Sequence, residues 1–204
     1  MIAIVDYGVG NLFSLRCSLD SLGLETVVTS DAGVIGNADR IILPGVGAFG
    51  DAAAKLRESG LDRVVIAQAK EGKPLLGICL GMQLLFEKSY EFGEHEGLGL
   101  LHGSVVPMQG TIPQSLKIPQ MGWNALIRKK NHPLLKSVRE GDCVYFVHSY
   151  YAADCQESLI ATTEYGVELT AVVAKANVMG CQFHPEKSGA VGLGILSAFA
   201  EFKT

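Results

Sequence analysis

One cysteine stands in a pattern that could make it a nucleophile. Cys79 is the centre of Gly77-Ile78-Cys79-Leu80-Gly81, and the apolar run Pro74-Leu75-Leu76 comes directly before it. Glycines on both sides allow a strand to turn sharply into a helix, which pushes the central side chain out at the carboxyl edge of a sheet. The N-terminus of that helix favours the thiolate and lowers the cysteine pKa. The motif predicts a nucleophile elbow; a buried structural cysteine is the alternative.

A thiolate nucleophile works with a base and with a group that orients the base. His184 is our candidate base, because it follows the apolar run from Val178 to Phe183 and opens the motif His184-Pro185-Glu186. Proline biases the preceding residue toward an extended backbone, in which residues i and i+2 point to the same side. Glu186 would then lie beside the imidazole and stabilise its charged form. Without Cys79, the same motif would read as two solvated polar residues at the end of a strand.

The other four histidines are weaker candidates. His148 ends an apolar segment that predicts a strand, and it is a credible site residue. His132 precedes Pro133 and is expected in a turn. His95 and His102 lie in a glycine-rich stretch, where a solvated loop position is the ordinary expectation.

Backbone groups that could hold a negative charge are indicated by Pro44-Gly45-Val46-Gly47, at the end of another predicted strand. Two glycines let the chain approach a ligand and turn its N–H groups toward developing charge. By itself, this segment would read as an ordinary Pro-Gly turn. A dinucleotide fingerprint is excluded, because Gly8-Val9-Gly10 is followed by Phe13 at the third glycine position. The absence of a Gly-Lys-Ser/Thr sequence excludes a phosphate-binding P-loop.

Composition narrows the class of protein. The chain has 204 residues, of which 48% are hydrophobic and 19% charged, so it can bury a core and is not disordered. Its net charge of -4 offers no surplus of lysine and arginine for a nucleic acid. The five cysteines show no Cys-x-x-Cys and no metal-ligand spacing, which predicts no metal site and a cytoplasmic protein. The first residues do not form a signal-peptide pattern, and no apolar run is long enough for a membrane helix.

The elements that must position these residues follow a consistent order. Apolar and β-branched runs predict strands over 1–5, 24–29, 40–43, 74–79, 103–107, 122–127, 143–148, 159–163, 169–175 and 178–183. Helical spacing predicts helices over 12–22, 51–72, 81–86 and 188–202, with Gly60 breaking the second of them. The alternation of strands and helices in the first half of the chain predicts an α/β fold. We expect one domain over 1–204, with an open, mixed, largely parallel sheet flanked by helices.

Taken together, these motifs resemble a known family. Pro44-Gly45-Val46-Gly47, the block from Gly77 to Leu85 and His184-Pro185-Glu186 resemble the three signatures of class I, or triad, glutamine amidotransferases, in the family's order. The resemblance covers essentially the whole chain. Four blocks are similar to the glutaminase subunits of imidazole glycerol phosphate synthases: Asp6-Tyr7-Gly8-Val9-Gly10-Asn11-Leu12, Pro44-Gly45-Val46-Gly47-Ala48-Phe49, Pro119-Gln120-Met121-Gly122-Trp123-Asn124 and Phe146-Val147-His148-Ser149-Tyr150-Tyr151.

The resemblance implies a mechanism without metal or cofactor. Cys79 would attack the side-chain amide of glutamine, His184 would transfer the proton, and Glu186 would orient His184. A thioester would form and water would release glutamate. By match to the family, the oxyanion hole would use backbone N–H groups of Gly45, Val46, Gly47 and Leu80, and glutamine would be held by Gly47, Gln83, Ser149 and Tyr150.

The resemblance also implies a partner. The ammonia would pass to a cyclase subunit, a (β/α)8 barrel, in a heterodimer that makes imidazole glycerol phosphate and aminoimidazole carboxamide ribonucleotide for histidine biosynthesis. Our candidates for the docking face are Met121, Gly122, Trp123, Asn124 and Lys187. For Trp123, plain core packing is an equal alternative.

Three other functions stay open at this point. The chain could be the glutaminase of another class I amidotransferase, which would have the same triad and a different partner. It could be a free-standing cysteine hydrolase of the same fold, active without any partner. It could also be a non-catalytic regulatory subunit, although the intact Cys79, His184 and Glu186 argue against that.

Overall fold

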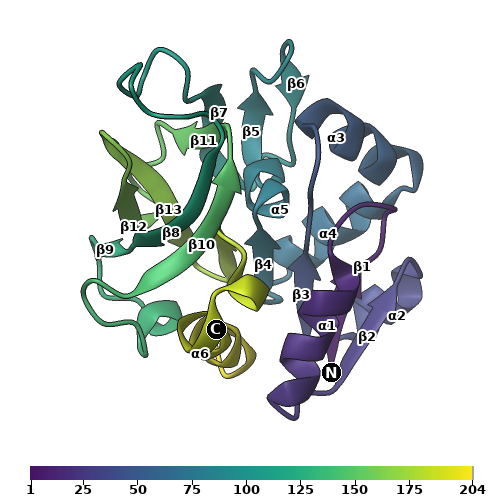
Figure 1. Ribbon diagram of the computed structural model, residues 1–204. Helices are drawn as coiled ribbons and strands as arrows, with labels where there is room; N and C mark the ends of the chain where they lie inside the picture. The colour runs from purple at the N-terminus through teal and green to yellow at the C-terminus, as the bar shows by residue number, and fades with distance from the viewer. Residues whose placement is uncertain (204) are drawn as a thin grey trace.

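The computed structural model describes residues 1–203 and places helices on both faces of a central sheet (Figure 1). Its eight strands lie in the spatial order β2 (Thr26–Thr29), β1 (Ile2–Val5), β3 (Arg40–Leu43), β4 (Leu75–Ile78), β14 (Val178–Cys181), β13 (Glu168–Lys175), β12 (Leu159–Glu164) and β9 (Ile127–Arg128). Neighbouring strands from β2 to β14 run parallel, whereas β13, β12 and β9 are added by antiparallel pairing. This is the mixed, largely parallel sheet of the predicted α/β fold.

Two smaller sheets complete the strand structure. One is the antiparallel pair β8 (Gln120–Ala125) and β10 (Cys143–His148). The other has four strands, in the order β11 (Tyr150–Ala153), β7 (Leu101–Pro107), β5 (Phe86–Ser89) and β6 (His95–Glu96).

The helices lie where the apolar spacing predicts them, with one addition. They are α1 (Leu12–Ser21), α2 (Ala32–Asn37), α3 (Phe49–Glu58), α4 (Leu61–Lys70), α5 (Leu80–Leu84) and α6 (Gly189–Ala200), besides the 3-10 turns η1 (Pro133–Leu135) and η2 (Pro185–Lys187). The predicted break at Gly60 separates α3 from α4, and its φ of 72° is the left-handed conformation that glycine adopts without strain.

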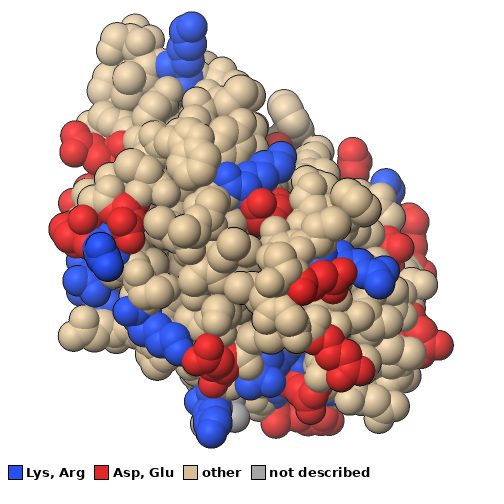
Figure 2. Space-filling view, turned by 60° about the horizontal axis from the view of Figure 1, so that its bottom comes forward, with Lys and Arg blue, Asp and Glu red and all other residues tan. Residues whose placement is uncertain are grey.

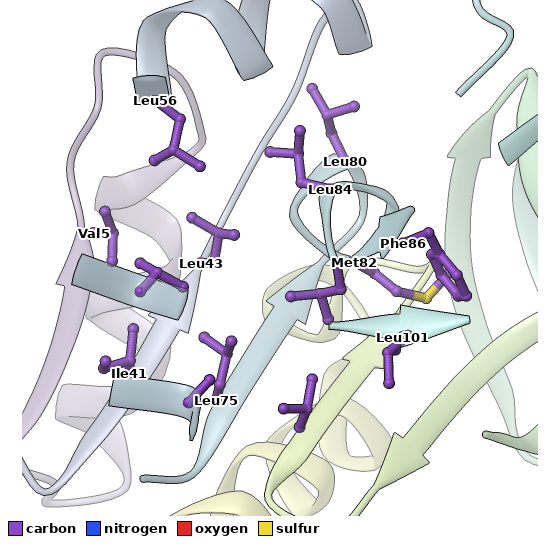
Figure 3. Packing of buried hydrophobic residues seen from close by; sticks show 14 of the residues in the cluster. Val5, Ile41, Leu43, Leu56, Leu75, Leu80, Met82, Leu84, Phe86 and Leu101 are labelled. Atoms are coloured by element: carbon purple, nitrogen blue, oxygen red, sulfur yellow. The ribbon is translucent and has the colours of Figure 1, made fainter. Parts of the chain in front are cut away.

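Alternation of side chains along β1 explains why helices cover both faces of the sheet. Ala3 and Val5 belong to a buried cluster with α2, α3 and α4, whereas Ile2 and Ile4 belong to a second cluster with α1 and α6. Successive side chains of a strand point to opposite faces, so a strand that is buried on both sides is apolar throughout. Figure 3 shows the first cluster, in which side chains from β1, β3, β4, α3 and α5 meet.

Helix α2 is the one helix that the sequence analysis does not predict. Its sequence contains Gly33 and Gly36, which weaken the helical signal. Asp31 compensates at the N-terminus, because its Oδ1 accepts a hydrogen bond of 2.9 Å from the N–H of Val34. Ile35 is fully buried, so packing against the core stabilises this short helix.

The segment after the nucleophile differs most from the prediction. The helix expected over 81–86 extends too far, because α5 ends at Leu84 and Phe86 begins β5. Phe86 pairs with Leu101 of β7. Strands β5, β6 and β11 lie where no strand is predicted, because pairing with distant segments rather than a local pattern makes them strands. The boundaries of the other predicted strands and helices agree within two residues.

On the face in Figure 2, acidic and basic side chains are mixed, and the basic ones do not gather into one large patch. Within residues 1–203, no helix is long and apolar enough to cross a membrane. In the same residues, no group of three or more His, Cys, Asp or Glu side chains could hold a metal ion.

Candidate active site

Cys79 lies on a sharp turn between β4 and α5, as the elbow motif predicts. Its φ of 55° and ψ of -113° are rare for a residue with a side chain, and such strain is characteristic of functional positions. A Cβ on Gly77 would lie 2.6 Å from the carbonyl oxygen of Gly81, and a Cβ on Gly81 would lie 1.8 Å from that of Leu43. The turn is therefore possible only with glycine at both positions.

The Gly81→Ala substitution should therefore destabilise the fold. The added methyl group meets the rigid backbone of β3, so we expect the free energy of unfolding to fall by about 3 kcal/mol or more. Gly36→Ala is the control, because its Cβ meets nothing within 4 Å. Urea unfolding of both variants checks the prediction, which is wrong if Gly81→Ala has the wild-type midpoint.

The Pro44–Gly47 segment packs directly against the elbow. A Cβ on Gly45 would lie 2.8 Å from both the backbone nitrogen of Gly81 and the hydroxyl of Tyr7. The Tyr7 hydroxyl donates a 2.7 Å hydrogen bond to the carbonyl of Pro44, and burial, then the nearby Cys79, raise the Tyr7 pKa. Tyr7 therefore fixes this segment beside the nucleophile.

The predicted oxyanion residues do not all face the pocket. Val46, Gly47 and Leu80 line it together with Cys79, whereas Gly45 is buried behind them. Leu80 begins α5, and N–H groups in the first turn of a helix have no partner within the helix. The backbone N–H of Leu80 is thus available to a negatively charged oxygen near Cys79.

His184 and Glu186 form a buried pair at the end of β14. Nδ1 of His184 lies 2.8 Å from Oε1 of Glu186, and the two side chains are 4% and 3% exposed. Burial opposes a charge on His184, but the interactions with Cys79 and Glu186 outweigh it and raise the His184 pKa to about 9. Such a histidine can hold a proton for a leaving group.

The local reason for this pairing differs from the prediction in one respect. His184 has the expected extended backbone, with φ -95° and ψ 99°. Glu186 lies in the 3-10 turn η2, not in a continued extended segment, and this turn brings its carboxylate to the ring. Ser188 stabilises the turn by donating a 2.6 Å hydrogen bond to the carbonyl of His184.

His148 is the other histidine that lines the pocket, and its surroundings make it a poor base. Its Nδ1 is 2.8 Å from the carbonyl oxygen of Tyr150, and its Nε2 is 3.0 Å from Oε1 of Gln120. Burial lowers its pKa to about 4. With both ring nitrogens occupied and the ring neutral, His148 cannot exchange a proton with Cys79, whereas His184 can.

The low pKa of His148 should make the stability of the protein depend on pH. Below pH 6.5 His148 is protonated in the unfolded chain, whereas in the folded protein it stays neutral down to about pH 4. The free energy of unfolding should therefore fall by about 3 kcal/mol as the pH is lowered from 6.5 to 4. We expect the stability difference between wild type and His148→Asn to shrink as the pH falls, and the difference between wild type and Thr163→Val to stay constant. Urea titrations at several pH values test this.

The pocket beside Cys79 has a volume of about 300 Å³ and contains several polar groups. It brings together the predicted residues Gln83, Ser149 and Tyr150 with Gly47. Glu91, from the glycine-rich stretch, also lines the pocket and is not among the residues predicted from the sequence. Its Oε2 accepts a 2.6 Å hydrogen bond from the N–H of Phe49, and partial burial raises its pKa.

Gln182 is a second residue that the sequence analysis misses. It is fully buried, and its Nε2 lies 3.8 Å from Sγ of Cys79. Its Oε1 accepts a 3.0 Å hydrogen bond from Nε2 of Gln83. The sequence does contain an indication of this role. Gln182 is a polar residue in the apolar run Val178 to Phe183, and it stands two residues before His184, so in an extended strand both side chains point to the same side.

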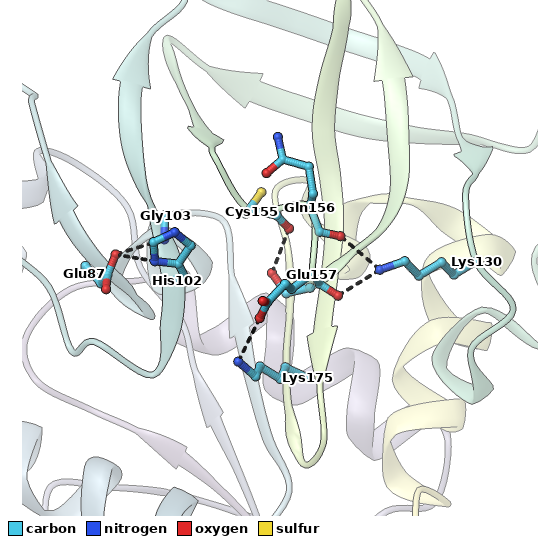
Figure 4. A network of polar contacts seen from close by, with 9 residues as sticks. Glu87, His102, Gly103, Lys130, Cys155, Gln156, Glu157 and Lys175 are labelled. Atoms are coloured by element: carbon cyan, nitrogen blue, oxygen red, sulfur yellow. Dashed lines mark hydrogen bonds and ion pairs between the residues drawn. The ribbon is translucent and has the colours of Figure 1, made fainter.

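A larger cavity of about 620 Å³ lies elsewhere and lacks a comparable arrangement (Figure 4). Four of the side chains that line it form two pairs: His102 with Glu87 at 3.0 Å, and Lys175 with Glu157 at 3.2 Å. Cys155 lines this cavity, and burial raises its pKa. Size alone therefore does not locate the active site.

The predicted docking residues lie on β8 and beside it. Met121 and Trp123 are 64% and 56% exposed, so the alternative that Trp123 packs in the core is wrong. Trp123 packs edge to face on Tyr145, with ring centroids 6.1 Å apart, and Nζ of Lys187 is 5.9 Å from the centre of the same ring. The other two predicted docking residues on β8 are Gly122, with φ 141°, and Asn124, whose Nδ2 donates a hydrogen bond to the carbonyl of Glu164.

Sequence comparisons find relatives that match nearly the full length of the chain. A relative from Caldanaerobacter subterraneus subsp. tengcongensis, named imidazole glycerol phosphate synthase subunit HisH, is 52% identical over 202 residues that cover 98% of each chain. The protein of the same name from Wolinella succinogenes is 50% identical over 203 residues, covering 98% of this chain and 99% of that one.

Comparisons with solved structures and with a family model agree on the fold. A glutamine amidotransferase crystal structure aligns with a TM-score of 0.75 and 20% identity, covering 98% of this chain and all of that one. The PurLQS structure from Thermotoga maritima aligns with a TM-score of 0.75 and 23% identity, covering 98% of this chain and 96% of that one. The model of the family described as glutamine amidotransferase class-I matches residues 3–200. The chain therefore belongs to the class I glutamine amidotransferases.

Proposed function

We propose that this chain is the glutaminase subunit of an imidazole glycerol phosphate synthase and releases ammonia from glutamine for histidine biosynthesis. The observation that carries the chemistry is the buried pair His184 and Glu186 beside Cys79, at a pocket large enough for an amino acid. The relatives that share about half of its residues over nearly the full length support this particular synthase over other class I partners. They also favour it over a free-standing hydrolase or a non-catalytic subunit.

The polar groups of the pocket suit the two ends of glutamine. Among the described residues that line it, Glu91 alone is acidic, so its carboxylate would pair with the α-ammonium group. Gln83, Ser149 and Tyr150, with the backbone of Gly47, would pair with the remaining polar groups. The side-chain amide of the substrate would then reach Cys79.

The chemistry proceeds through a covalent intermediate. Once the proton of Cys79 has passed to His184, Sγ of Cys79 attacks the amide carbon, and backbone N–H groups of Val46, Gly47 and Leu80 hold the oxygen. His184 gives the proton to the leaving ammonia, and Glu186 keeps the ring in place. Water then hydrolyses the thioester to glutamate and regenerates Cys79.

The ammonia requires a second protein that uses it. The relatives are named as subunits of a synthase, and we propose that the partner is its cyclase, a (β/α)8 barrel that forms a heterodimer with this chain. Met121, Gly122, Trp123, Asn124 and Lys187 would form the docking face. This face adjoins the active site, because Met121 pairs with Val147 of β10, whose carbonyl oxygen is 4.0 Å from Sγ of Cys79.

Trp123→Ala should weaken binding to the cyclase without unfolding the chain. An exposed tryptophan that becomes buried in an interface is often a main contributor to affinity, so we expect Kd to rise about 30-fold. Tyr90→Ala, which removes a partly exposed aromatic ring at the larger cavity, is the matched control. Titration calorimetry with the cyclase measures both, and an unchanged Kd for Trp123→Ala would remove this residue from the docking face.

The proposed function is tested by glutamate release from glutamine. The purified chain is assayed alone, with a cyclase subunit, and with that subunit and its nucleotide substrate. We expect release to rise sharply with the cyclase and nucleotide. Equal release in all three assays would keep the glutaminase chemistry and reject the synthase.

We also propose that residues 1–204 form one amidotransferase domain and that the protein works in the cytoplasm. The two main buried clusters each draw residues from the first and last thirds of the chain, which supports one domain. All five cysteines are free thiols, which suits a reducing compartment.

A further inference from the structure

A row of buried polar groups begins on β8 and leads toward the nucleophile. Gln120 opens β8 and lies opposite His148, at the end of β10. Its side-chain amide is 3.0 Å from Nε2 of His148, and Nδ1 of His148 is 2.8 Å from the carbonyl oxygen of Tyr150. Both side chains are buried, and the proposed mechanism uses neither.

The carbonyl of Tyr150 has a second partner in the substrate pocket. Nε2 of Gln83 donates to it at 3.1 Å and also donates to Oε1 of Gln182 at 3.0 Å. An amide nitrogen has two protons, so both protons of Gln83 are used. Only Oε1 of Gln83 is left to accept a hydrogen bond from a bound amino acid.

The chemistry of each atom fixes the direction of these hydrogen bonds. A backbone carbonyl only accepts, so Nδ1 of His148 carries the proton, and in a neutral ring Nε2 is then an acceptor. Gln120 must therefore turn its NH2 group toward His148, because the two ends of an amide can exchange places in the same space. In the opposite orientation Nε2 of Gln120 is buried without a partner among residues 1–203.

From this geometry we propose that Gln120 and His148 are positioning residues of the glutamine site. Gln120 holds the ring of His148, His148 holds the carbonyl of Tyr150, and that carbonyl fixes Gln83 with its Oε1 available to the substrate. The inference rests on the proposed function, since it assigns both residues to glutamine binding. Because Gln120 begins the strand that carries Met121 and Trp123, the same bonds join the pocket to the proposed docking face.

The test uses glutaminase kinetics in the complex with the cyclase and its nucleotide. His148→Leu removes the donor to Tyr150, so we expect KM for glutamine to rise about tenfold and kcat to stay within about threefold. His148→Asn places an N–H near the position of Nδ1 and should return KM to within about threefold of wild type. Gln120→Leu should raise KM about threefold. The pH profile of kcat should keep its shape, because His148 transfers no proton.

Thr163→Val is the matched control. It removes a buried hydrogen bond of 2.9 Å to the carbonyl of Ala125, at the other end of β8, and touches no group of the pocket. Its KM should equal the wild-type value. The inference is overturned if His148→Leu behaves like this control, or if His148→Asn raises KM as much as His148→Leu. If His148→Leu does not fold, Gln120→Leu with an unchanged KM overturns it equally.

Two measurements on the chain alone separate this inference from the proposed function. Nitrogen-15 NMR of the histidine rings should find His148 neutral, with its proton on Nδ1, and a proton on Nε2 would contradict the inference. Alkylation of Cys79 by iodoacetamide should have the same rate within about twofold in all variants, since glutamine takes no part. Failure of wild-type glutamate release would instead reject the proposed function.

Discussion

Cys79→Ala should abolish glutamate release from glutamine in the complex with the cyclase, to at least about 10^4-fold below the wild-type rate. Without the thiol no thioester can form, and the pocket offers no other nucleophile of comparable strength. The variant should fold normally, because alanine is smaller than cysteine and meets the same backbone strain at φ 55°. Circular dichroism and urea unfolding establish that it folds.

The matched controls are two exposed cysteines. Cys17 and Cys143 lie at the surface, outside the pocket, so their alanine variants should keep full activity. A glutamine analogue that carries a chloroketone should alkylate Cys79 selectively, because burial raises the pKa of Cys155 and Cys181 and leaves them as unreactive thiols. Mass spectrometry locates the label. Glutamate release that persists in Cys79→Ala would exclude this residue as the nucleophile.

Glu186→Gln should lower kcat by about 10^3-fold while leaving KM for glutamine nearly unchanged. The amide keeps the shape of the carboxylate but cannot stabilise a charged imidazole, and the same change in the Ser-His-Asp triad costs about 10^4-fold. Glu186 is among the groups that raise the His184 pKa to about 9. Without its charge that pKa falls, so the alkaline limb of the pH profile should move to lower pH.

Rates of glutamate release between pH 6 and pH 10 measure both effects. Glu201→Gln is the control, since this carboxylate pairs with Lys136 at the surface, away from the pocket. An unchanged alkaline limb in Glu186→Gln would show that Glu186 does not act on His184. A large rise in KM would instead place Glu186 in substrate binding.

The elbow and the central strands can be predicted from the amino-acid sequence alone. A Cβ on Gly77 would collide with the backbone of Gly81 in the same turn, and such a local requirement can be read from a few residues. The parallel strands β1 and β4 are apolar throughout and β3 is apolar after Arg40, because both faces of these strands are buried. The family motifs predict that His184 and Glu186 act with Cys79, although no local pattern predicts the 3-10 turn that contains Glu186.

Tertiary packing selects the polar residues that gather around Cys79 and its pocket. Glu91 and His148 line the pocket from the segment after β5 and from the end of β10, and Gln182, directly after β14, lies against Sγ of Cys79. The sheet order brings β4 next to β14, although about a hundred residues separate them in the chain. Hydrogen bonds between such distant residues leave no periodic pattern in a sequence. The contacts that keep His148 neutral and make His184 the base are therefore visible only in the folded protein. The same holds for the exposure of Trp123.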